Sequence, residues 1–154
     1  DREEYASLLA RYARSQRLAK PDGTTVHWID ENLHPDAGDW ISRTRLMSWS
    51  NGGWDEAKGG CERGKDYNHS TYCDNVISGL FGIRPGDGCV DINPMLPADW
   101  DWAYLDCVPC HGCLVTVLWD RTGQKYRRGS GFRVFVDCME KVSLQQIGAC
   151  SINI

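Results

Sequence analysis

The sequence has 154 residues, of which 42% are hydrophobic, and its formal net charge is -4 with an estimated pI of about 5.5. This length suits one domain or two small pieces, and the hydrophobic fraction allows a real core. The acidic balance offers no basic stripe for a phosphate backbone, and no apolar run approaches the roughly 18 residues of a membrane-spanning helix, so we expect neither nucleic acid nor a membrane as a partner.

The first predicted element is a helix from Glu3 to Leu18. Apolar side chains recur there at helical spacing, and arginines occupy the positions between them. Pro21 and the residues after it end the helical pattern. Thr24–Ile29 is predicted as a short extended segment.

The middle of the chain is predicted to hold a loop and a second helix. Residues 41–47 suit a short helix or turn, and residues 50–65 form a long loop rich in Gly and charge. Helical spacing returns from Asn68 to Ile83, where Tyr72 and Leu80 fall on one face. We expect this second helix to end at the Arg-Pro-Gly sequence that follows.

The apolar spacing changes to a period of two beyond Gly88, which predicts strands. Four strands are expected, at residues 89–93, 102–108, 114–119 and 132–137, with turns at 109–112 and 122–123. Helices followed by antiparallel strands make an α+β order. The change of period divides the chain into residues 1–86 and residues 87–154.

Eight cysteines in 154 residues is a high and even number, which favours disulfides and a secreted protein. Three of them lie in the segment Cys107–Cys113, where thiolates and His111 have a spacing that can bind zinc. No second Cys-x-x-Cys accompanies this segment, and Pro109 and Gly112 suit a tight turn. We therefore expect disulfide-bonded cysteines at a turn, and neither a metal nor another cofactor.

The segment from Trp28 to Trp40 sets acidic residues among tryptophans. A carboxylate beside apolar rings loses hydration, which can shift its pKa toward that of a useful acid or base. Indole faces also stack on sugar rings, so Glu31 is the candidate for carbohydrate chemistry. Spacing alone favours a plain loop carboxylate at this position, and Asp30, Asp36 and Asp39 are rival candidates.

Trp28, Trp40 and His69 are the candidate neighbours of a bound sugar. Tryptophans are more often core residues, and His69 is equally well explained as a structural hydrogen-bonding group. Asn68 begins an Asn-His-Ser sequence that matches the N-glycosylation pattern, although such polar residues are also common at helix starts.

The sequence Glu31-Asn32-x-x-Pro35-x-x-Gly38 resembles an element near the end of the catalytic domain in (α/α)6-barrel inverting glycoside hydrolases. These are the enzymes of the mannosylglycerate hydrolase and processing α-glucosidase I type. Residues 65–74 resemble the closing helix of the barrel, and residues 90–94, 108–112 and 118–120 resemble a β-rich C-terminal appendage. The resemblance covers most of residues 3–138.

The resemblance implies that Glu31 is the general base that activates water. The family's general acid is an aspartate far upstream, in a region that this sequence does not include. Inverting chemistry needs two carboxyl groups about 6.5–9.5 Å apart, and a barrel of about twelve helices does not fit in a chain of this length. The resemblance therefore implies terminal barrel helices followed by a small antiparallel β domain, with no activity from this chain alone.

The main expectation is thus the C-terminal segment of a secreted inverting glycoside hydrolase. Its expected partners are a carbohydrate and the remainder of a larger chain or a partner subunit. The alternatives are a non-catalytic extracellular structural or assembly protein on the same fold, a lectin-like sugar-binding module, and a small zinc domain.

Overall fold

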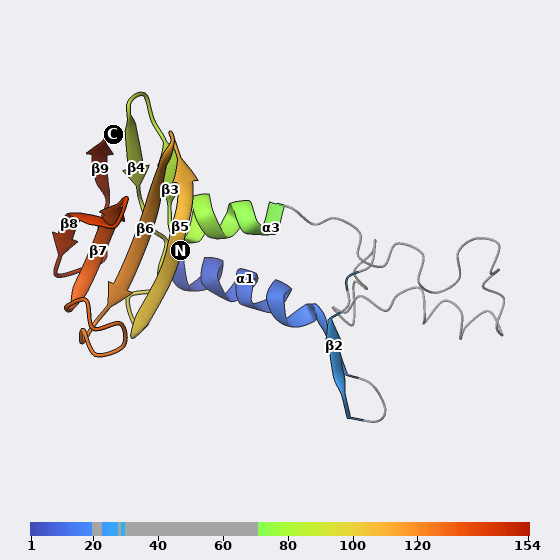
Figure 1. The fold of residues 1–154 in the computed structure, drawn as a ribbon. Coiled ribbons are helices and arrows are strands. Elements are labelled where there is room, and N and C mark those ends of the chain that lie inside the picture. Colours follow the sequence, from blue (N-terminus) through green and yellow to red (C-terminus); the bar gives the residue numbers. More distant parts are fainter. Residues whose placement is uncertain (20–22, 28, 30–70) are drawn as a thin grey trace, which may run out of the picture. The chain divides into compact units, whose positions relative to one another are not determined.

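The structure is a computed structural model that describes residues 1–19, 23–27, 29 and 71–154 (Figure 1). The chain divides into two compact units. Unit 1 combines Asp1–Leu9 with Ser70–Ile154, and unit 2 is Ala10–His69. No helix in the described part of the chain is long and apolar enough to cross a membrane.

The predicted first helix is present as α1, which spans Arg2–Ser15. Asp1 begins it, because its Oδ1 accepts a hydrogen bond of 2.9 Å from the backbone N–H of Glu4. The helix ends before the predicted Leu18, since the chain enters strand β1 (Arg17–Ala19).

Strand β1 pairs antiparallel with β2 (Thr25–His27) in a two-stranded sheet. The predicted extended segment is therefore confirmed at Thr25–His27. The pairing places Arg17 opposite His27, a partner that helical spacing along the sequence does not reveal.

The second helix ends earlier than predicted and changes type within its described residues. These residues form α3 (Thr71–Asp74) and a π-helical turn, η3 (Asn75–Leu80). At Gly82 the backbone adopts φ +69°, and a Cβ atom there would lie 2.1 Å from the carbonyl oxygen of Asn93. Only glycine allows this close approach, so the chain turns here and the helix does not reach Ile83.

Seven further strands form two larger antiparallel sheets in unit 1 (Figure 1). The three-stranded sheet has the order β3-β4-β9, and its strands are β3 (Ile83–Pro85), β4 (Cys89–Ile92) and β9 (Cys150–Asn153). The four-stranded sheet has the order β5-β6-β7-β8, and its strands are β5 (Trp102–Cys110), β6 (Cys113–Asp120), β7 (Gly131–Val136) and β8 (Met139–Leu144).

The four predicted strands are confirmed as β4, β5, β6 and β7, and the α+β class is confirmed with them. Strands β3, β8 and β9 were not predicted. All side chains of β8 are exposed or half-buried, so it lacks a clear alternation of buried and exposed positions. The assignment of the helices to a barrel and the boundary between residues 86 and 87 stay predictions.

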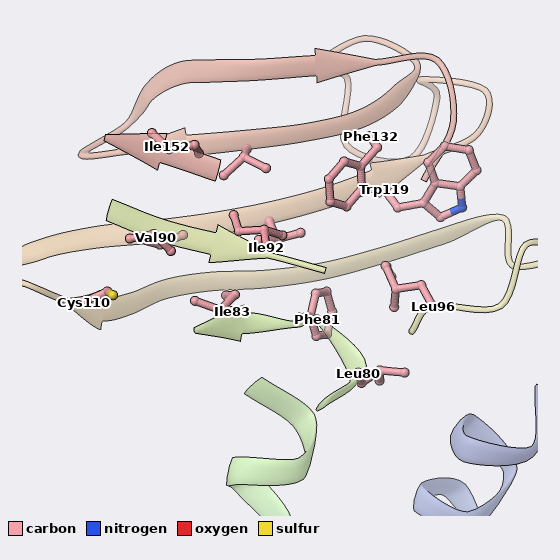
Figure 2. Packing of buried hydrophobic residues seen from close by; sticks show 14 of the residues in the cluster. Leu80, Phe81, Ile83, Val90, Ile92, Leu96, Cys110, Trp119, Phe132 and Ile152 are labelled. Atoms are coloured by element: carbon pink, nitrogen blue, oxygen red, sulfur yellow. The ribbon is translucent and has the colours of Figure 1, made fainter. Parts of the chain in front are cut away.

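The hydrophobic core of unit 1 draws side chains from both larger sheets (Figure 2). Val90 and Ile92 of β4 are at most 1% exposed, and Phe132 of β7 is fully buried. Leu80 and Phe81 join this cluster from the end of the helix. The residues of β6 that point inward are Val115, Val117 and Trp119, so the alternate residues of β6 point to the opposite face of its sheet.

The expected disulfides are not supported by the structure. The described cysteines all have free thiols; they are Cys73, Cys89, Cys107, Cys110, Cys113, Cys138 and Cys150. Cys61 lies outside the described residues. The turn predicted around residues 109–112 is confirmed, because His111 and Gly112, with φ of 49° and 83°, connect the paired residues Cys110 and Cys113.

Candidate functional site

The residues predicted to carry chemistry lie outside the described part of the chain. They are Glu31, Trp28, Trp40 and His69, together with the rivals Asp30, Asp36 and Asp39 and the predicted glycosylation position Asn68. Their roles stay predictions. The described residues offer a different site, on the outer face of the four-stranded sheet of unit 1.

Exposed and buried side chains alternate along β5, and the exposed ones form the first part of this outer face. Trp102, Tyr104 and Asp106 follow one another at every second position and are exposed, whereas Ala103 between them is buried. Tyr104 is opposite Leu118 of β6 in the strand pairing. The outer face of β5 therefore carries two aromatic rings and a carboxylate.

A bulge in β5 fixes the position of the carboxylate. The register shifts between Leu105 and Val108, and Cys107 within the bulge has a φ of 54°. The backbone N–H of Cys107 donates to Oγ1 of Thr116 at 3.1 Å, and that hydroxyl donates to Oδ1 of Asp106 at 2.6 Å. Thr116 thus links the bulge to the carboxylate and orients it.

The segment that connects β6 to β7 is anchored over this face by Asp120. This side chain is 1% exposed. Its Oδ1 accepts a hydrogen bond from the backbone N–H of Gly123 at 2.8 Å, and its Oδ2 accepts one from the backbone N–H of Tyr126 at 2.9 Å. Burial of a charged group is tolerated when its oxygens are satisfied in this way, so Asp120 holds the connecting segment in one conformation.

The anchored segment places Tyr126 beside the aromatic side chains of β5. The ring centroids of Tyr126 and Tyr104 are 5.0 Å apart with an interplanar angle of 31°, and Trp102 meets Tyr126 edge-on at 6.2 Å. Offset and edge-on arrangements are the favourable ones for aromatic pairs. The three rings therefore form one contiguous aromatic group.

A hollow of about 180 Å³ opens beside these rings. We call it the outer hollow; its lining side chains come from β5, β6, β7, the segment between β6 and β7, and the turn after β7. They are Tyr104, Asp106, Thr116, Leu118, Tyr126, Arg128, Phe135 and Cys138. The volume is below the roughly 300 Å³ at which pockets for drug-sized ligands begin, so the outer hollow suits a smaller ligand or one unit of a longer chain.

The lining groups have shifted pKa values with identifiable causes. The hydrogen bond from Thr116 is the main cause that lowers the pKa of Asp106. Burial, followed by the hydrogen bond to Asp106, raises the pKa of Tyr104. Burial and then the charge of Asp120 raise the pKa of Tyr126. At neutral pH the outer hollow therefore contains an ionised carboxylate and two neutral phenols.

Cationic side chains lie against the aromatic rings of this face. The guanidinium carbon of Arg128 is 5.9 Å from the ring centroid of Phe135, and Nζ of Lys125 is 4.3 Å from that of Trp102. These distances are those of cation–π contacts. Arg128 thus brings a positive donor to the same hollow that contains Asp106.

The outer hollow does not contain the pair of carboxyl groups that most glycoside hydrolases use. Glycoside hydrolysis generally uses these two groups on either side of the scissile bond. Asp106 is the one carboxyl group that lines the outer hollow, and both oxygens of the buried Asp120 are occupied by backbone N–H groups. Within the described residues, no group of three or more His, Cys, Asp or Glu side chains is arranged to hold a metal ion.

Sequence reasoning identified β5 as a strand but overlooked its outer face. The signal was present, since Trp102, Tyr104 and Asp106 recur with a period of two. No comparable signal marks Tyr126 and Arg128, because they lie between strands and reach the site through the anchor at Asp120.

Replacing Thr116 by valine is expected to raise the pKa of Asp106 toward its ordinary value of 3.8, because the variant loses the hydrogen bond that stabilises the carboxylate. The pKa is measured by following the carboxyl carbon of Asp106 in an NMR pH titration. Thr122→Val in the segment after β6 is the matched control. An unchanged or lower pKa in the Thr116 variant would contradict this account.

The same pKa shift has a defined effect on stability. Because the folded-state pKa of Asp106 lies below the ordinary value of 3.8, its ionised form stabilises the fold above that pH. The contribution is lost as the pH falls through the lowered folded-state pKa. Asp106 is exposed, so solvent screening keeps this contribution small.

Comparison with known proteins gives two similarities. Residues 83–138 match the model of the glycosyl hydrolase family 65 C-terminal domain. A solved structure described as a sialidase is similar over 99% of this chain, with 34% sequence identity and a TM-score of 0.71. A search of curated proteins found no match.

The chain spans 12% of the length of the sialidase that it matches. The matched family segment begins at β3 and extends through the turn after β7. Both similarities support the predicted C-terminal part of a glycoside hydrolase.

Proposed function

We propose that the chain is the C-terminal segment of an inverting glycoside hydrolase whose catalytic domain is an (α/α)6 barrel. In this proposal residues 1–86 supply terminal helices and the catalytic-base loop, and residues 87–154 form the β-rich appendage. Glu31 is the general base, and the general acid belongs to an upstream part of a longer chain. Trp28, Trp40 and His69 contact the sugar.

The observation that carries the proposal is the match of residues 83–138 to the C-terminal domain of a glycoside hydrolase family. The Glu-Asn-x-x-Pro-x-x-Gly sequence from Glu31 to Gly38 precedes that segment, in the order that the resemblance implies. The small share of the sialidase that the chain spans, 12%, supports an origin within a larger protein.

The proposed roles follow from the requirements of inversion. A base removes a proton from water as the water attacks the anomeric carbon, and an acid on the opposite side protonates the leaving oxygen. Glu31 supplies the first function. Tryptophan rings beside it stack on the sugar and exclude water, which raises the basicity of a neighbouring carboxylate.

The full-length protein is expected to hydrolyse a glycoside with inversion, whereas this chain alone should show no turnover above background, because it lacks the acid. The product configuration is read from the anomeric proton signals in ¹H NMR during the first minutes, before mutarotation. Testing a panel of α- and β-glycosides identifies the substrate. Release of a product with the configuration of the substrate would rule out inversion. Turnover by this chain alone would contradict the proposal that its general acid lies in an upstream part of a longer chain.

A second candidate is a sugar-binding module without catalytic activity, which the aromatic outer hollow favours. It predicts glycan binding with no hydrolysis by the full-length protein. We also propose secretion on the cysteine content alone, eight in 154 residues, although no disulfide joins the described cysteines. Detection of the protein in the culture medium of its source cells tests that point.

A further inference from the structure

Three large aromatic side chains are exposed on strand β5 and just before it. Trp100, Trp102 and Tyr104 are 36%, 49% and 42% exposed. The other exposed large hydrophobic side chains of the described residues are scattered, for example Leu8 on α1 and Met139 on β8. Contiguous exposed apolar surface marks a binding site more often than scattered side chains do.

The rings beside the outer hollow are held in place before any ligand arrives. Tyr126 is fixed through its backbone N–H to the buried Asp120, and its ring packs against Tyr104 at 5.0 Å. A ligand that stacks on these rings loses little binding energy to ordering the protein. Flat ring faces at the edge of a small hollow fit the C–H face of a sugar ring.

The polar groups of the outer hollow match the hydroxyl groups of a sugar. A hydroxyl group can both donate and accept a hydrogen bond. The carboxylate of Asp106 accepts, with its orientation set by Thr116, and the guanidinium of Arg128 donates. One sugar ring can therefore use both groups at once.

The charges favour a neutral sugar over an acidic one. Asp106 is ionised at neutral pH and would repel a carboxylated sugar within the same small hollow. Arg128 is the one cation among the lining side chains, and its guanidinium carbon lies 5.9 Å from the ring centroid of Phe135. Arg133, a further cation on this face, is paired with Glu140 at 2.6 Å.

We propose that the outer hollow is a saccharide-binding subsite that holds one unit of a neutral oligosaccharide. The sugar ring packs against the Tyr104–Tyr126 pair at the edge of the hollow, and its hydroxyl groups bond to Asp106 and Arg128. The choice of a saccharide as the ligand rests on the proposed function. The subsite is formed by unit 1 alone, so its occupancy does not depend on catalysis.

The test is an NMR titration of the 154-residue chain with maltotriose, cellotriose and mannotriose, and separately with a trimer of galacturonic acid. We expect at least one neutral trimer to shift the backbone amide signals of Gly123 and Tyr126. Tyr104→Ala and Asp106→Asn are each expected to weaken that binding by about tenfold, the scale of one lost stacking or hydrogen-bonding contact.

Leu114→Ala is the matched control, because Leu114 is 45% exposed on the same sheet but does not line the outer hollow. It should bind like the unaltered chain. Asp106→Asn keeps the size of the side chain, so it still tests the location of binding if Tyr104→Ala disturbs folding. Unchanged affinity in both hollow variants would overturn the location, and tighter binding of the galacturonic acid trimer would overturn the neutral class.

The outcomes also separate this inference from the proposed function. Hydrolysis with inversion by the full-length protein, combined with no response of the chain to any neutral trimer, would overturn the subsite alone. Binding at the outer hollow without hydrolysis by the full-length protein would support the subsite and overturn the hydrolase proposal.

Discussion

Replacing Asp120 by alanine is expected to lower the free energy of unfolding by about 3 kcal/mol, since each hydrogen bond to a charged acceptor is worth about 1.5–3 kcal/mol. The carboxylate is 1% exposed and accepts from two backbone N–H groups, those of Gly123 and Tyr126. The variant leaves both donors without this partner. Some of the loss is recovered where water reaches the half-buried N–H groups, which places the expected value near the lower end of the sum.

Urea denaturation of the variant and the unaltered chain measures this change. Asp99→Ala is the control, because Asp99 is exposed and a substitution there is expected to change stability by less than about 0.5 kcal/mol. Asp120→Asn adds a second test. It keeps the shape of the side chain, but its amide group presents N–H to one of the two backbone donors.

Loss of the anchor should also affect the outer hollow. In the Asp120→Ala variant we expect faster hydrogen exchange at the amides of Gly123 and Tyr126 and loss of the proposed saccharide binding. If Asp120→Ala were as stable as Asp99→Ala and kept slow exchange at these amides, the anchoring role would be wrong.

Replacing Glu31 by glutamine in the full-length protein is expected to reduce kcat by about 10²–10⁴-fold, the usual contribution of a general base. Glutamine has nearly the same shape but cannot take a proton from water, so folding and substrate binding should be retained. The measurement is steady-state kinetics on the substrate found by the glycoside panel. Thermal unfolding of the variant shows whether the fold is intact.

The rival carboxylates provide the controls for this prediction. Asp36→Asn and Asp39→Asn should keep near-normal turnover if Glu31 is the base. Azide needs no deprotonation before it attacks, so adding it should restore turnover to Glu31→Gln alone. Near-normal turnover by Glu31→Gln, with a large loss in either aspartate variant, would transfer the base function to that aspartate.

The elements that sequence patterns predicted are those with strong local periodicity. Helical spacing over residues 3–18 matches α1, and the period-two segment at residues 114–119 matches β6, whose inner residues Val115, Val117 and Trp119 are at most 5% exposed. Strand β9 was overlooked because its partner, β4, lies far away in the sequence. The two strands pair antiparallel, with Cys89 opposite Asn153 and Ile92 opposite Cys150. The helix end at Leu80 also depends on a distant contact, that of Gly82 with Asn93.

The sequence by itself determined the α+β order, strand β2 and four of the later strands, and the resemblance of the Glu31 segment to a glycoside hydrolase element. Only the tertiary structure decided that the described cysteines are free thiols and that β5 exposes an aromatic face. It also decided that Tyr126 and Arg128 join Tyr104 and Asp106 around one hollow. The physical reason is that local spacing sets which face of a strand is apolar, whereas a binding site depends on contacts between distant segments, here held by the buried Asp120.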